Sequence, residues 1–180
     1  MKKILLLFSL VLLVGCFNSN DIKKFKKEYE ALNDGPIPVN INLEYQVTYV
    51  DSDEAADFLN NDTGIILFGN PEDLQTRSVV ETLFKVAFDN DLTLKYYNPS
   101  TYEDNGIDEF AEIVGALSAF LPTNDDGEKL LRTPDVYFVK DGEILGNFYG
   151  SIDEFDDEEL TDEQKEELYD HYNQLAKLIK

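Results

Sequence analysis

Apolar residues gather in short segments along the chain, and the spacing within each segment is that of either a strand or a helix. Runs of β-branched, aromatic and leucine residues predict strands at residues 45–50, 65–68, 92–97, 136–139 and 144–149. The run at 65–68 has no polar position, which is typical of a central strand covered on both faces. Asp141 and Gly142 predict a tight hairpin turn between the last two strands.

Helical spacing fills the intervals between these strands. A helix is expected after the capping residues Asp51 and Ser52, a longer one ends near Asn90, and another covers residues 107–121. Thr161 and Gln164 have the spacing of a capping box that opens the last helix. The apolar side chains of that helix are expected to be Leu168, Tyr172, Leu175 and Ile179.

Strands and helices therefore follow one another in the order β-α-β-α-β-α-β-β-α. Alternation predicts parallel strands joined by crossover helices, and the closing hairpin adds antiparallel strands. The predicted fold class is α/β, a three-layer α/β/α sandwich around a mixed central sheet with a C-terminal hairpin. We place this domain at residues 40–180. Residues 16–39 are expected to hold a tether and a short helix at 21–32, which the Gly- and Pro-rich residues 33–38 end.

Residues 1–15 have the composition of an export signal rather than of a folded segment. Two lysines precede an apolar run at 4–14, which is too short for a bilayer span of about 20 residues. Residues 13–16, Leu-Val-Gly-Cys, have the pattern of a lipobox, in which a small residue precedes the cleavage site and the cysteine thiol is alkylated by diacylglycerol. We therefore expect a lipoprotein signal peptide at 1–15 and lipidation of Cys16. An ordinary secretory signal with a chance cysteine is the alternative.

Lipid on Cys16 decides the expected location of the protein. Two acyl chains supply the two signals that stable membrane attachment needs. The expected location is the cell membrane, with the domain exposed on the extracytoplasmic side and the lipid anchor as the contact with the membrane.

The charge of the chain narrows the list of partners. The formal net charge is −22 and the isoelectric point is about 4.1. Nucleic acid is not expected as a partner, because phosphate contacts need clustered Lys and Arg. The same charge opposes flat contact with anionic lipid, so the domain is expected to stand off the membrane. With 43% hydrophobic and 12% aromatic residues, the chain can still form a core.

Few residues offer catalytic or metal chemistry. Cys16 is the only cysteine, so its acylation would leave no free thiol and no thiolate metal ligand. The single histidine, His171, is expected to be a surface or partly packed residue, since the sequence contains no nucleophile elbow. The acidic residues between 153 and 159 lack the spaced ligands and glycine of a calcium loop. We predict no cofactor and no metal.

Three segments resemble thioredoxin-like lipoproteins of Gram-positive bacteria. Residues 65–83 are similar to the active-site region of that family: an apolar strand, Phe-Gly, a short turn, an arginine and an apolar helix. Residues 132–142 resemble its cis-proline segment and hairpin, and residues 160–164 resemble the start of its last helix. The resemblance covers about 40–180. It implies a thioredoxin fold and a cis peptide bond at Pro134.

The chain departs from this family at the two cysteines. Asp73 and Thr76 stand in their places, with Leu74 and Gln75 between them. Disulfide exchange needs an attacking thiolate and a resolving thiol, so the redox activity of the family is not expected. Asp73 is expected either to cap a helix or to offer its carboxylate to a partner.

The resemblance also suggests what could remain without thiols. In the family, the segment that corresponds to Thr133 and Pro134 presents backbone groups to an extended peptide, a form of strand addition. We expect these residues to face Asp73 and Thr76 across a shallow groove that binds a protein or peptide; the alternative is that Pro134 is retained only for the turn. Two other functions stay open: an oxidoreductase relative or other enzyme that needs a thiol-bearing partner, and a purely structural surface lipoprotein.

Overall fold

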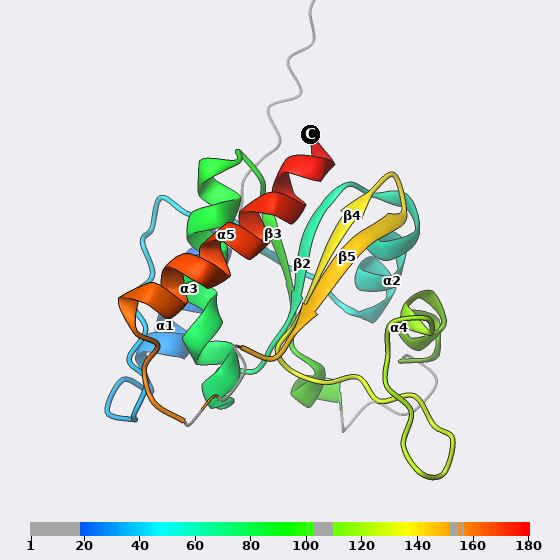
Figure 1. Ribbon diagram of the computed structural model, residues 1–180, viewed down its shortest axis with the longest axis horizontal. Coiled ribbons are helices and arrows are strands. Elements are labelled where there is room, and N and C mark those ends of the chain that lie inside the picture. Colours follow the sequence, from blue (N-terminus) through cyan, green and yellow to red (C-terminus); the bar gives the residue numbers. More distant parts are fainter. Residues whose placement is uncertain (1–18, 103–109, 152–154, 156) are drawn as a thin grey trace, which may run out of the picture.

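The computed structural model describes residues 19–102, 110–151, 155 and 157–180. A five-stranded sheet in the order β1-β3-β2-β4-β5 forms its centre (Figure 1). The strands are β1 (Val47–Tyr49), β2 (Gly64–Phe68), β3 (Leu94–Tyr97), β4 (Asp135–Lys140) and β5 (Glu143–Tyr149). The first three strands of this order pair in parallel, whereas β4 is antiparallel to both β2 and β5. The predicted mixed sheet with its C-terminal hairpin is therefore confirmed.

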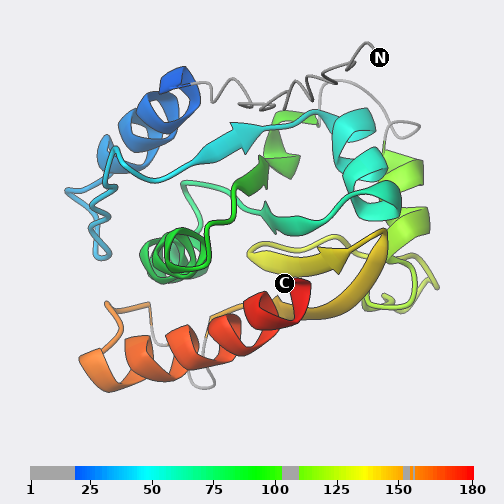
Figure 2. The same cartoon turned by 90° about the horizontal axis from the view of Figure 1, so that it is seen from above.

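Helices cover both faces of the sheet. They are α1 (Ser19–Glu30), α2 (Ser52–Asn61), α3 (Leu74–Asp89), α4 (Phe110–Leu117) and α5 (Asp162–Ile179), with a 3-10 turn at Pro99–Tyr102. Figure 2 shows α1, α3 and α5 on one side of the sheet and α2 and α4 on the other. This arrangement is a thioredoxin-like α/β sandwich, as predicted.

The central strand β2 explains why the core has two halves. Successive side chains of a strand point to opposite faces. Ile65 and Leu67 accordingly pack with α1, α3 and α5, while Ile66 and Phe68 pack with α2 and α4. Every residue of β2 is buried, which the unbroken apolar run predicted.

Helix α1 belongs to the domain, which corrects the expected boundary at residue 40. Phe25 and Tyr29 are both 0% exposed and stack with ring centroids 4.1 Å apart. Phe25 also meets Phe84 and Tyr96 edge to face. The break at 33–38 therefore returns the chain to the sheet instead of separating a tether from the domain. The predicted signal peptide and the lipidation site Cys16 lie outside the described residues.

The predicted turn and caps are confirmed. Asp141 and Gly142 both have positive φ, 50° and 75°, in the turn between β4 and β5. A side chain at position 142 would run into the Asn60 carbonyl, so glycine is required there. Capping boxes open α2 at Asp51 and α5 at Thr161. In the part of the chain that the structure describes, no helix has both the length and the apolar character needed to cross a membrane.

Candidate functional site

The start of α3 holds the residues that replace the two cysteines, and their side chains are bonded to each other. The Asp73 carboxylate accepts hydrogen bonds from the backbone N–H groups of Gln75 (3.1 Å) and Thr76 (3.2 Å). The Thr76 hydroxyl donates a third bond to the same carboxylate at 2.6 Å. Thr76 is fully buried, and its methyl group leaves no room for a side chain at Gly69. Asp73 is therefore an N-cap, as one of the two alternatives predicted.

Arg77 follows this cap and ties the N-terminal segment to α3. Its side chain is only 3% exposed. The guanidinium donates to the carbonyl oxygens of Ile37 (2.8 Å), Tyr29 (2.9 Å) and Pro71 (3.3 Å), and to Asn33 Oδ1 (2.8 Å). Burial lowers the pKa of Arg77 from its usual value. All four acceptors are neutral oxygens, so the arginine acts as a cross-link between segments and not as an ion-pair partner.

The Thr133–Pro134 peptide bond is cis, as the resemblance implied. Pro134 is buried, and its carbonyl accepts a hydrogen bond from the Gly150 N–H at 2.8 Å. Because Phe68 pairs with Asp135, these residues lie at the same end of the sheet as the start of α3. The carboxylate of Asp73 and the hydroxyl of Thr76 are nevertheless engaged with each other and with α3. On the Asp73 and Thr76 side of the expected groove, the side-chain polar groups are thus already hydrogen-bonded within α3.

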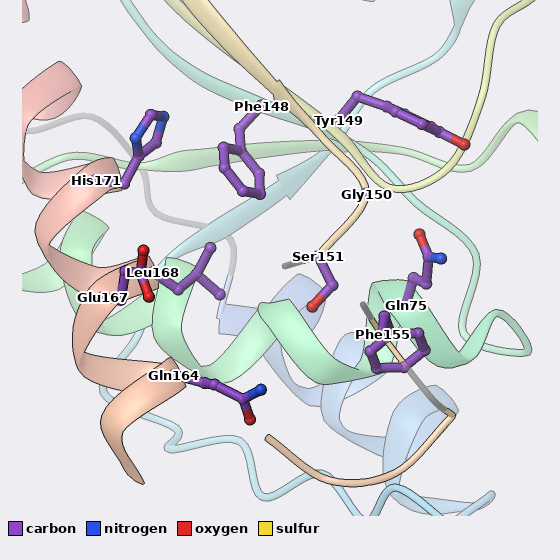
Figure 3. Close-up of a pocket in the computed structure, with 10 residues that line it drawn as sticks. All are labelled: Gln75, Phe148, Tyr149, Gly150, Ser151, Phe155, Gln164, Glu167, Leu168 and His171. Carbon is purple, nitrogen blue, oxygen red and sulfur yellow. The ribbon is translucent and has the colours of Figure 1, made fainter. Parts of the chain in front are cut away.

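A cleft of about 740 Å³ lies beside the start of α3, between α5 and the end of β5 (Figure 3). It is lined by Gln75, Phe148, Tyr149, Gly150, Ser151, Phe155, Gln164, Glu167, Leu168 and His171. Gln75 is the only one of the four residues 73–76 in this lining, and Pro134 is joined to the lining residue Gly150 by a hydrogen bond. The cleft was not foreseen from the sequence.

The walls of the cleft combine apolar and polar groups. Figure 3 shows Phe148 and Leu168 beside the cleft, while Tyr149 points away from His171. Phe148 lies against the His171 ring, with centroids 4.8 Å apart. Ser78 Oγ is 2.8 Å from the Gln75 carbonyl oxygen and 2.9 Å from Ser151 Oγ, so a hydrogen-bonded contact joins the wall from α3 to the wall from β5.

Gly150 lines the cleft where β5 ends. Its φ of 80° lies in the region that favours glycine. A Cβ atom at this position would be 3.2 Å from the side-chain oxygen of Gln75. A side chain at position 150 would therefore adopt an unfavourable backbone conformation and crowd the Gln75 side chain.

A buried carboxyl group follows the cis-proline bond, and sequence reasoning missed it. Asp135 is 2% exposed; it accepts hydrogen bonds from the Tyr137 hydroxyl (2.6 Å) and the Asn147 side-chain amide (3.1 Å). Burial raises the pKa of Asp135 to about 6, although both hydrogen bonds act in the opposite direction. An acidic residue at the head of an otherwise apolar strand is the feature that could have pointed to it.

The remaining candidates are His171 and the acidic residues between 153 and 159. His171 is exposed on α5, with one ring face on Phe148, as expected for a partly packed residue. Residues 152–154 and 156 of the acidic run lie outside the described residues. Within the described ranges, no three His, Cys, Asp or Glu side chains lie close enough together to hold a metal ion.

No protein family matches this chain, and no curated protein is similar enough to be matched with it.

Proposed function

We propose that this chain is a lipid-anchored protein of the extracytoplasmic face of the cell membrane, whose thioredoxin-like domain binds an extended protein segment and has no redox activity. Residues 17–180 contain no cysteine, so the domain has no thiolate for disulfide exchange. Binding without catalysis is the function that this chemistry leaves to the site.

The cleft beside α3 is the observation that carries the proposal. Its volume of about 740 Å³ lies in the range of 300–1,000 Å³ that is typical of ligand sites. Apolar walls from Phe148 and Leu168 would hold a side chain of the partner. Polar groups of Gln75, Ser151 and Gln164 would orient it.

The neighbouring loop supports an extended ligand. The backbone N–H and C=O groups of Thr133 form no hydrogen bond with any described residue. An extended segment that leaves the cleft past Gly150 would meet these free groups, as in strand addition. Thr133 would then have the role that the resemblance implies.

A lipid anchor on Cys16 would hold the domain close to the membrane. Because α1 begins at Ser19 and packs into the core, the chain from Cys16 to the domain spans at most about 10 Å. The domain is then held close to the bilayer instead of standing off it. Intact-mass analysis of the native protein tests this part: a mature N-terminus other than acylated Cys16 would contradict it, and Cys16→Ser should release the protein from membranes.

Peptide selection with a cleft-blocking variant tests the binding part. The mature lipidated protein in detergent micelles is used to select displayed random peptides. Gln75→Trp fills the cleft from its wall. Gln46→Trp is the control, since Gln46 is exposed next to β1 at the opposite edge of the sheet. Selected peptides should bind wild type and Gln46→Trp but not Gln75→Trp. Failure to select any peptide would leave a purely structural role.

A further inference from the structure

We propose that the segment bound in the cleft is cationic: Lys or Arg side chains lie along α5 while a neighbouring apolar side chain enters the cleft. This inference depends on the proposed function and names the chemistry of the partner.

A second hollow continues the cleft along α5. It has a volume of about 500 Å³ and is lined by Glu163, Glu166, Glu167, Asp170, His171 and Gln174. Glu167 and His171 belong to both hollows. The four carboxylates are spaced by three and four residues, so they lie on one face of the helix. A ligand that leaves the cleft along α5 therefore passes over four negative charges.

These four carboxylates differ from several other acidic side chains in their ion pairing. Lys26 pairs with Glu30, Lys85 with Asp89 at 2.6 Å and Lys165 with Glu159 at 2.7 Å. In the described part of the chain, Glu163, Glu166, Glu167 and Asp170 form no ion pair, and no Lys or Arg lines either hollow. Like charges three and four residues apart repel one another. A cationic ligand would relieve that repulsion.

The net charge of the whole protein also favours a cationic ligand. A net charge of −22 attracts cations over long distances and steers them toward the surface. The same net charge would repel an anionic segment. The apolar wall made by Phe148 and Leu168 adds the second requirement, because a bare polycation would leave it unfilled.

Matched peptides test the two requirements separately. The first probe alternates Lys or Arg with Leu and Phe; the second has Gln at each basic position; the third has Ser at each apolar position; and spermine is the fourth. Dissociation constants are measured for the mature lipidated protein in micelles, at low and high salt. The first probe should bind at least about tenfold more tightly than each of the others, a difference of about 1.4 kcal/mol. Its affinity should fall as salt rises.

Charge-neutralising variants locate the effect. Glu163→Gln with Glu167→Gln should weaken binding of the first probe by about tenfold and reduce its salt dependence. Glu112→Gln with Glu143→Gln changes the net charge equally, at exposed positions on α4 and at the start of β5, and should leave binding nearly unchanged. Equal loss in both double variants would show a general charge effect and overturn the local proposal.

The remaining outcomes separate this inference from the proposed function. If the second probe binds as tightly as the first and Gln75→Trp abolishes both, the cleft binds peptides but the cationic inference is wrong. If spermine binds as tightly as the first probe, the ligand is a small polycation and not a peptide. If no probe binds and peptide selection also fails, the proposed function is wrong as well.

Discussion

The start of α3 and the cleft beside it are adjacent in the chain, yet they use their polar groups in opposite ways. At the start of α3, the carboxylate of Asp73 accepts three hydrogen bonds from its own helix. In the cleft, Gln75 and the face of α5 leave polar and charged groups open to a ligand. The site where the resembling family carries its thiols is thus a structural cap here. The proposed binding site is the cleft beside it.

The two regions therefore depend on different contacts. A cap fixes the direction of α3 and needs no partner. The cleft wall formed by Gly150 and Ser151 is held by contacts with Pro134 and Ser78, not by Asp73. Changes at the start of α3 should therefore affect stability, whereas changes in the cleft should affect binding.

The largest expected effect on stability is at Arg77. Arg77→Met would leave the carbonyl oxygens of Ile37 and Pro71 without their buried donor and would remove one of the two donors to the Tyr29 carbonyl oxygen. Each buried unsatisfied group costs about 1–3 kcal/mol, so the free energy of unfolding should fall by roughly 3 kcal/mol or more. Denaturant titration measures this loss. Arg132→Met, at an exposed position, should change stability by less than about 1 kcal/mol; equal losses would contradict the cross-link.

Asp135 should give a smaller, pH-dependent effect. Its folded-state pKa of about 6 lies above its usual value of 3.8, so the folded state binds the proton more tightly than the unfolded state does. The stability that this group contributes is present below about pH 4 and is lost as pH rises through 6. The side chain introduced by Asp135→Asn cannot lose a proton. The unfolding free energy of this variant, relative to that of wild type, should therefore rise by roughly 2–3 kcal/mol between pH 4 and pH 8.

The measurement is the difference in unfolding free energy between the two proteins across that pH range, since the many other acidic groups titrate in both. A constant difference would show that Asp135 has an ordinary pKa despite its burial.

The cap at Asp73 should have a modest effect on stability and none on binding. Asp73→Ala should cost about 1 kcal/mol and Asp73→Asn only a few tenths, since Asn caps about as well as Asp. Glu72→Ala, at the exposed neighbouring residue, is the matched control and should change stability by less than about 0.5 kcal/mol. Thermal melts and peptide titration together check this. Loss of binding in Asp73→Asn without loss of stability would return the carboxylate to the functional site.

Local patterns predicted most of the fold. The apolar run at 65–68, the turn at Asp141 and Gly142 and the capping box at Thr161 each have a local physical cause, and each was found where expected. Helix α1 was misplaced outside the domain because residues 33–38 have the composition of a linker. Only the contacts of Phe25 and Arg77 with distant residues show that the chain turns back there.

The candidate site was predicted less well than the fold. The resemblance correctly located Asp73 as a helix start and Pro134 as a cis proline. The cleft joins Gln75 to the end of β5 and to α5, which are more than seventy residues away in sequence, and no local pattern marks such a meeting. The buried position of Asp135 likewise depends on Tyr137 and Asn147 across the hairpin.

Site-specific photocrosslinking at two adjacent residues tests the central claim most directly. Gln75 lines the cleft, whereas Leu74 lines a separate hollow of about 450 Å³ formed with residues 31–36 and 71–77. A photoreactive amino acid is placed at one position or the other in the full-length protein in its own membrane. The account predicts a crosslinked protein adduct from position 75, abolished by competition with the basic apolar peptide, and no such adduct from position 74. Equal adducts at both positions, or an adduct only at position 74, would contradict it.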